Sequence, residues 1–188
     1  RTGGPAKFVL VNIHITNRGV ERVISALTNS AGQYSASFTP LPGEGGLMQF
    51  GAAHPGLATA PVQDEVSVYG LRAEPSTISL SLAESTTSTG SLTISNLANL
   101  SVTGLTATLN GLPAGVQFTP TFVSNTLASA GTVALNYSLT TQGPLARTTF
   151  TLSITSTEGA AVDVPVSLTV VSITPRLVAE PAQLNAGM

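Results

Sequence analysis

The sequence predicts an all-β fold built from antiparallel β-sandwiches in tandem. Hydrophobic residues alternate with Ser and Thr at a period of two, which is the pattern of strands with one buried face. Of the 188 residues, 42% are hydrophobic and only 9% are charged, whereas 20 are Ser and 26 are Thr. No stretch combines a helical period with capping residues. We therefore expect the hydroxyl side chains to line the outer faces of strands and not to form a disordered tract.

The first block of the chain, residues 1–69, predicts four to five strands. We expect them at 8–16, 20–27, 33–39, 47–53 and 63–69. In the third, Tyr34, Ala36 and Phe38 are expected to face inward. Turns are expected at 17–19 and 29–32, and a rigid, then flexible loop of Pro and Gly at 40–46. Because these strands are few for a full sandwich, we expect the block to be N-terminally incomplete or completed from outside the chain.

The second block predicts a complete sandwich of seven or so short strands. They are expected at 77–82, 92–97, 102–109, 133–139, 149–154 and 162–170. Turn residues separate them, namely Thr89-Gly90, Asn110-Gly111, Pro113-Ala114-Gly115, Ala130-Gly131, Gln142-Gly143-Pro144 and Glu158-Gly159. Short strands at a regular spacing of about 8–12 residues are typical of immunoglobulin-like sandwiches.

A repeated motif sets the domain boundaries. Leu71-Arg72-Ala73-Glu74-Pro75 returns 106 residues later as Leu177-Val178-Ala179-Glu180-Pro181, and about 100 residues is the size of one immunoglobulin-like sandwich. We interpret the motif as a strand entry, because Pro is tolerated at the first residue or the edge of a strand. The sequence thus predicts an immunoglobulin-like domain at 1–69 and another at 70–174. Residues 175–188 are then a linker and the first strand of a further repeat, or a donor strand.

Both blocks resemble known bacterial sandwich domains. Residues 28–40 and 51–56, with their T-x-x-x-G-x-Y-x-A-x-F-x-P pattern, resemble the immunoglobulin-like repeats of bacterial surface proteins. Residues 90–97, 111–116 and 130–135 are similar to the cell-adhesion-related and glycosidase-associated domains of large secreted proteins. Asn99-Leu100-Ser101 departs from the short Gly-containing turn of that family. The resemblance covers most of residues 20–174 and implies an extracellular spacer or adhesion module.

The chain is poor in the groups that catalysis requires. It has no Cys and two histidines, His14 and His54, which we expect to be structural or at the surface. Its Asp and Glu residues are scattered, and no G-x-S-x-G spacing is present. A net charge of −2 without a basic block argues against a nucleic-acid partner. No run approaches the roughly 18 apolar residues of a membrane span.

The best candidate site is a calcium site at the seam between the two blocks. Asp64, Glu65 and Glu74 would supply three carboxylates there, although Ca²⁺ takes six to eight oxygen ligands. The alternative is an ordinary solvated junction without a metal. No other cofactor is expected.

The resulting functional hypothesis is a non-catalytic spacer in a large extracellular or cell-surface protein, adhesin-like or fibre-forming. Its partners would be neighbouring domains of the same chain, or further copies in a homo-oligomer or filament. One alternative is a carbohydrate- or protein-binding accessory module of a secreted enzyme. Another is a filament subunit that assembles by strand donation.

Overall fold

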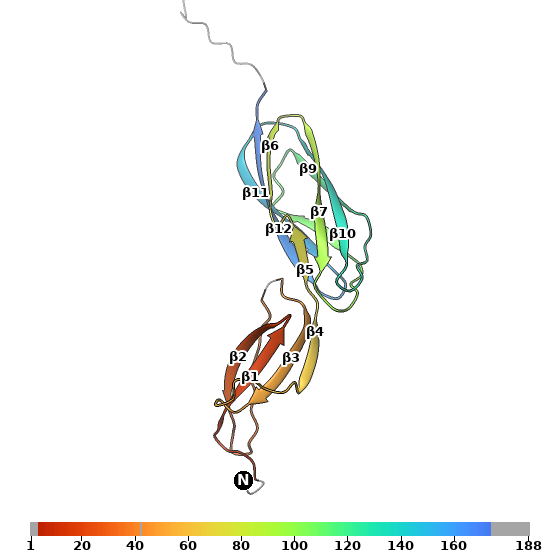
Figure 1. Cartoon of the computed structure of the whole chain (residues 1–188). Helices are drawn as coiled ribbons and strands as arrows, with labels where there is room; N and C mark the ends of the chain where they lie inside the picture. The colour runs from red at the N-terminus through yellow and green to blue at the C-terminus, as the bar shows by residue number, and fades with distance from the viewer. Residues whose placement is uncertain (1–3, 42, 174–188) are drawn as a thin grey trace, which may run out of the picture.

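The computed structural model describes residues 4–41 and 43–173, and in these ranges the protein is all-β (Figure 1). Twelve strands form three four-stranded sheets, and no described residue is helical. The all-β part of the predicted fold class is confirmed. Within the described ranges there is no helix of the length and hydrophobicity needed to cross a membrane.

The first sheet, which we call the N-terminal sheet, is fully antiparallel with the order β2-β1-β3-β4. Its strands are β1 (Leu10–Asn17), β2 (Val20–Leu27), β3 (Gly46–Ala53) and β4 (Asp64–Val68). A two-residue turn joins β1 to β2, with φ of 50° at Arg18 and 79° at Gly19. Two consecutive positive φ values match the right-handed twist of a hairpin, which is why Gly is favoured there.

One expected strand of the first block is wrong. Residues 33–39 form no strand, and Tyr34 and Ala36 are exposed instead of facing inward. Phe38 packs edge-on against Phe50 of β3, with 6.2 Å between ring centroids. The Arg22 guanidinium lies 4.3 Å from the Phe38 ring centroid. The segment is therefore anchored to the sheet by one aromatic ring and not by a hydrogen-bond ladder.

The other two sheets face each other across a shared core and form a β-sandwich. One has the order β5-β7-β10-β9, with β5 (Leu71–Glu74), β7 (Thr87–Asn96), β10 (Thr132–Thr141) and β9 (Val116–Phe122). The other has the order β6-β12-β11-β8, with β6 (Ile78–Ala83), β12 (Ala161–Val171), β11 (Leu145–Thr155) and β8 (Thr106–Asn110). All pairs are antiparallel except β6 with β12, which is parallel.

The core of the sandwich comes from alternate positions of both sheets. Leu92 and Ile94 of β7 and Leu135 of β10 meet Leu152 of β11 and Val164 of β12, all at 1% exposure or less. The positions between them carry Ser and Thr toward solvent, as the period of two predicts. The hydroxyl-rich composition is thus explained by the outer faces of strands.

Three local predictions in the sandwich are corrected. The Leu71–Pro75 motif is not one strand entry, because β5 and β6 belong to different sheets and Pro75 lies in the crossing between them. Thr89-Gly90 is not a turn but lies inside β7. The strand expected at 102–109 is shorter, at Thr106–Asn110, and Val102 makes only an isolated bridge to Leu127.

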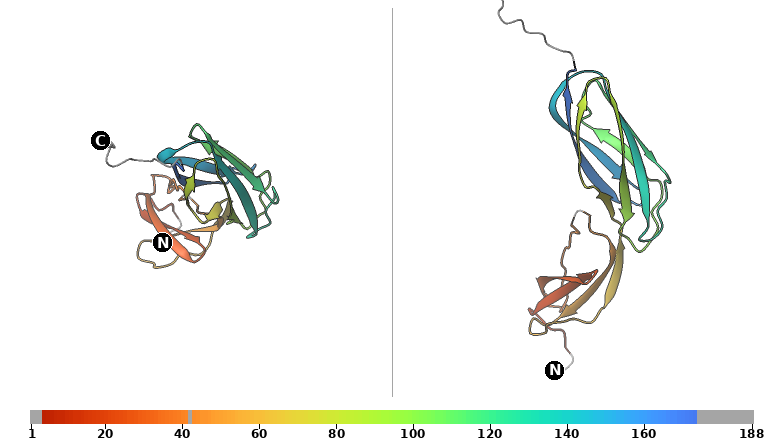
Figure 2. Two further views of the ribbon diagram at one scale, coloured as in Figure 1. Left: turned by 90° about the horizontal axis from the view of Figure 1, so that it is seen from above. Right: turned by 45° about the horizontal axis from the view of Figure 1, so that its top comes forward.

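The N-terminal sheet and the sandwich lie end to end, and only Tyr69 and Gly70 separate β4 from β5 (Figures 1 and 2). The second copy of the motif, at 177–184, and the predicted linker or donor strand at 175–188 lie outside the described residues.

Candidate functional site

The three carboxylates of the predicted calcium site lie on two strands. Asp64 and Glu65 begin β4, and Glu74 ends β5. Asp64 Oδ1 accepts a hydrogen bond from the Glu65 amide at 2.8 Å, and Glu65 Oε1 accepts one from Gln49 Nε2 at 2.8 Å. Among residues 4–41 and 43–173, no three His, Asp or Glu side chains are grouped in a way that could hold a metal ion.

The calcium site therefore stays a prediction from the sequence. Thermal unfolding in calcium and in chelator separates the two alternatives. A calcium site at the seam raises Tm in calcium and loses the increase in chelator, whereas a solvated junction gives the same Tm in both.

The two histidines occupy different environments. His14 on β1 is 6% exposed, and its Nδ1 lies 2.9 Å from Glu21 Oε1. Because a carboxylate only accepts, Nδ1 carries the proton, and the buried Nε2 has no partner among the described residues. His54 is exposed, and its Nδ1 accepts the Gly56 amide at 3.1 Å. Neither ring is hydrogen-bonded to a serine hydroxyl within the described chain.

The junction between the N-terminal sheet and the sandwich is closely packed. Gly45, which precedes β3, and Gly70, which precedes β5, are both buried and lie against each other. A Cβ added to Gly45 would lie 2.9 Å from Gly70 N and 3.0 Å from Gly70 Cα. A Cβ added to Gly70 would lie 2.7 Å from the Glu44 carbonyl oxygen. Backbone therefore meets backbone here, with no room for any side chain.

Hydrogen bonds close the same junction. The Leu97 amide donates to the Gly70 carbonyl at 2.8 Å. The Arg18 guanidinium, on the β1–β2 turn, donates through Nη2 to the Leu97 carbonyl. Asn17 Nδ2 donates to the Gly45 carbonyl at 3.4 Å. We call Asn17, Arg18, Gly45, Gly70 and Leu97 the junction cluster, since together they connect the turn, the loop before β3, the linker and the residue after β7.

A buried amide holds Leu97 in place. Asn96, 2% exposed at the end of β7, donates through Nδ2 to the carbonyls of Leu100 at 2.8 Å and Ala128 at 2.9 Å. Its Oδ1 accepts the Ala98 amide at 2.9 Å. A buried side-chain amide with both ends bonded fixes the loop around it. The Asn96 side chain therefore sets the path of the segment that carries Leu97 to the junction.

Hydrogen bonds between Glu158 and Thr103 hold another turn of the sandwich in place. The Glu158 carboxylate accepts the Thr103 hydroxyl at 2.6 Å and the Thr103 amide at 3.0 Å. These bonds, the hydroxyl first, lower the pKa of Glu158 from its usual 4.5 to about 2, because they stabilise the ionised form. The turn between β11 and β12 is thereby tied to the segment that precedes β8.

The sequence did not reveal the junction cluster. Arg18 was expected only as a turn residue, and Gly45 only as part of a flexible loop, yet Gly45 is buried. The one available signal was Gly70, directly before the repeated Leu-x-Ala-Glu motif, but a glycine at a strand end has many causes. The contact between Gly45 and Gly70 depends on tertiary packing, which no local pattern encodes.

No family model and no curated protein sequence matches this chain. Among solved structures, the chain is similar to the secreted serine protease VesC from Vibrio cholerae, at 13% identity and a TM-score of 0.42, covering 91% of this chain and 47% of that one. It is similar to the Vibrio cholerae VesB protease, at 12% identity and a TM-score of 0.37, covering 88% of this chain and 66% of that one.

A third similar structure is the BIgI domain of beta protein from S. agalactiae, bound to CEACAM1, at 12% identity and a TM-score of 0.31. That match covers 56% of this chain and 99% of the domain. The chain thus spans about half the length of the VesC protein that it matches. With every one of these TM-scores below 0.5, the likenesses add no detail to the fold given by the three sheets.

Proposed function

We propose that the chain is a non-catalytic spacer of a large extracellular surface protein, made of two immunoglobulin-like units in tandem. The strand order of the sandwich supports the assignment for residues 71–171. In an immunoglobulin constant-type domain, strands A, B, E and D form one sheet and C, F and G the other. The orders β5-β7-β10-β9 and β12-β11-β8 follow that arrangement, and β6 adds one parallel strand beside β12.

For the N-terminal unit the proposal depends on the sequence resemblance. Its described part is one four-stranded sheet, with Phe38 and Glu44 of the intervening segment packed against it through Phe50 and Arg22. The Arg22–Glu44 pair has two short contacts, 2.7 and 2.6 Å, and lies partly buried. Such a charge-assisted pair fixes the segment over the sheet and gives the unit a defined end surface at the junction.

The observation that carries the spacer proposal is the junction cluster. A spacer holds its two ends at a defined separation only if its units keep a fixed relative orientation. A two-residue connection alone would allow the units to rotate about several backbone bonds. Here Gly45 and Gly70 are in backbone contact and Arg18 is bonded to the Leu97 carbonyl. Relative motion is the default for two units of one chain, so the stiffness that a spacer requires depends on these contacts.

The surface of the sandwich supports a structural role beside neighbouring units. Strands β7, β9 and β10 contain no charged residue, and their outer faces present Ser, Thr, Gln and Asn. A neutral hydroxyl face is solvated without long-range repulsion, so neighbouring units can lie close together at any ionic strength.

Backbone ¹⁵N relaxation tests the proposal on the intact chain. If the chain is a spacer, amides of β1–β4 and of β5–β12 fit a single, elongated rotational diffusion tensor. Two independent correlation times, one for each unit, would contradict it.

One observation favours strand-mediated assembly as a second candidate function. Strand β2 pairs only with β1, and its Val20, Val23 and Leu27 are 66%, 47% and 60% exposed. An edge strand with exposed apolar side chains is a template for a further strand. Light scattering over a concentration series separates the two candidates, since the spacer stays monomeric and strand assembly gives polymers that grow with concentration.

A further inference from the structure

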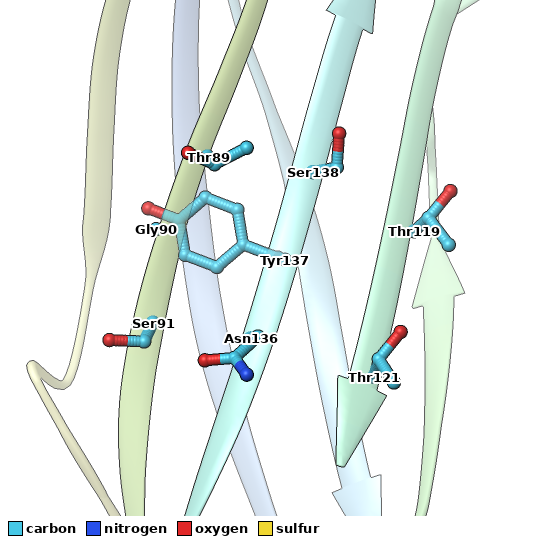
Figure 3. Close-up of a pocket in the computed structure, with 8 residues that line it drawn as sticks. All are labelled: Thr89, Gly90, Ser91, Thr119, Thr121, Asn136, Tyr137 and Ser138. Atoms are coloured by element: carbon cyan, nitrogen blue, oxygen red, sulfur yellow. The ribbon is translucent and has the colours of Figure 1, made fainter. Parts of the chain in front are cut away.

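The outer face of the β5-β7-β10-β9 sheet holds a groove that the spacer role does not use. It is shallow and open to solvent, with a volume of about 500 Å³. Its lining comes from three neighbouring strands (Figure 3), namely Thr89, Gly90 and Ser91 of β7, Asn136, Tyr137 and Ser138 of β10, and Thr119 and Thr121 of β9.

The polar side chains of the groove form two rows across the strands. Strand register places Ser91, Asn136 and Thr121 in one row. It places Thr89, Ser138 and Thr119 in the other. In a sheet, neighbours across strands are about 4.8 Å apart and the two rows about 7 Å apart. The groove therefore presents a regular, two-row array of short hydrogen-bonding groups.

The six polar side chains make no hydrogen bond to any other side chain or backbone group of the described residues. Some hydroxyls elsewhere on the described part of the sandwich pair, while others, such as those of Thr93 and Thr149, do not. Thr106 bonds Thr155 at 2.9 Å, and Ser153 donates to Asp163 at 2.6 Å on the opposite outer face. Just beyond the groove, Thr87 bonds Thr140 at 2.9 Å. The donors and acceptors of the groove are thus left for water or for a ligand.

The groove is neutral, and the residues beneath it are closely packed. None of the three strands carries a charged residue, so there is no partner for a phosphate, sulfate or carboxylate. The Tyr137 ring lies against Gly90 and stacks on Phe118 at 5.1 Å between centroids. Burial raises the pKa of the Tyr137 phenol, so that it too stays neutral.

We propose that this groove binds a neutral oligosaccharide. Hydroxyls both donate and accept, as sugar hydroxyls do, and the Asn136 amide at the centre of its row offers two donors and one acceptor to a pair of neighbouring sugar hydroxyls. The rows can follow successive sugar units along a chain. Because no aromatic face lies open in the array, binding depends on hydrogen bonds in competition with water and is weak for a single site.

The test is an NMR titration of the intact ¹⁵N-labelled chain with neutral hexasaccharides of glucose, mannose, xylose and N-acetylglucosamine, and with a hyaluronan fragment as the charged comparison. We expect amides of residues 89–91, 119–121 and 136–138 to shift with at least one neutral sugar, saturating with a Kd of about 1 mM, and not with hyaluronan. If no neutral sugar moves these amides at about 10 mM, or if the shifts lie elsewhere, the proposal is overturned.

Two variants keep the test specific. Asn136→Ala and the isosteric Thr119→Val both change exposed side chains on strands. Their folding is to be checked first by the dispersion of their amide spectra. We expect each to weaken binding about tenfold, since each removes hydrogen bonds to the sugar. Ser153→Ala, on the opposite outer face, is the matched control and should bind like the parent chain. Unchanged binding by Asn136→Ala would contradict the assignment.

Discussion

Replacing Gly70 by Ala perturbs the junction without disturbing the local backbone. Gly70 does not have a left-handed φ, so alanine can adopt its conformation, and the effect is purely steric. The new Cβ would lie 2.7 Å from the Glu44 carbonyl oxygen and 3.1 Å from Gly45 Cα. Ordinary contact begins near 3.4 Å, so the loop before β3 must retreat by about 0.7 Å.

The obstruction at Gly70 is backbone, so no rotamer change can relieve it. Overpacking of this kind destabilises by about 1–3 kcal/mol. The loss should fall on the contact between the N-terminal sheet and the sandwich, because the Leu97–Gly70 and Arg18–Leu97 hydrogen bonds are displaced with it. Protection of β1 and β3 amides should therefore decrease more than protection of the sandwich core.

Native-state hydrogen exchange measures both units in one experiment. Gly143→Ala is the matched control, since Gly143 has no heavy atom within 4 Å of its added Cβ and no left-handed φ. That variant should stay within about 0.5 kcal/mol of the parent chain. If Gly70→Ala behaves like Gly143→Ala in β1 and β3, the reasoning about the junction is refuted.

Three further predictions concern the sandwich. Asn96→Ala leaves the Leu100 carbonyl and the Ala98 amide without their partner and removes one of the two donors to the Ala128 carbonyl, so urea unfolding should show a loss of about 3 kcal/mol, and an unchanged midpoint would contradict the role of the amide. Leu152→Ala, at a fully buried site, should cost about 2–5 kcal/mol, whereas Val123→Ala, at 70% exposure, should stay within about 0.5 kcal/mol, both measured by the same unfolding curves. The Glu158 carboxylate stabilises the folded state above pH 4.5 and loses this effect as the pH falls toward about 2, so Glu158→Gln should flatten the dependence of Tm on pH in that window. If Tm of Glu158→Gln falls with decreasing pH as steeply as Tm of the parent chain, the stabilising role of the Glu158–Thr103 hydrogen bonds is contradicted.

The strands of the sandwich could be predicted because one alternating pattern determines both their conformation and their burial. Leu92 and Ile94 point to the core and Thr93 to solvent, as their spacing in the sequence indicates. Residues 33–39 alternate equally well, but a strand also needs a partner with free hydrogen-bonding groups. The segment forms no ladder with the free edge of β2, and its Phe38 ring contacts Phe50 and the Arg22 guanidinium instead.

Two glycines show where sequence reasoning failed. Gly90 suggested a turn, yet it lies in β7, where a Cβ would come 2.3 Å from the Tyr137 phenol oxygen. Gly70 had no role assigned from the sequence, yet it is half of a backbone contact. In both cases glycine is required by a partner far away in the sequence, across the register of β10 or across the junction.

The proposed oligosaccharide groove could not be predicted from the sequence either, because it depends on strand register. Asn136 is 15 residues from Thr121 and 45 from Ser91, and only the pairing of β10 with β9 and β7 brings the three into one row. The strand expected at 133–139 places Asn136 on an outward face, whereas Ser91 and Thr121 lie outside the expected strands. The sequence could not indicate which outward side chains would remain without partners.

The distance between the two units tests the central claim, a stiff spacer, most directly. The chain has no Cys, so Ser25→Cys on β2 and Thr108→Cys on β8 give two unique sites for spin labels. The junction cluster predicts one narrow distance distribution by pulsed electron spin resonance, which broadens when Gly70→Ala is added. A broad distribution in the parent chain, unchanged by Gly70→Ala, would contradict the spacer.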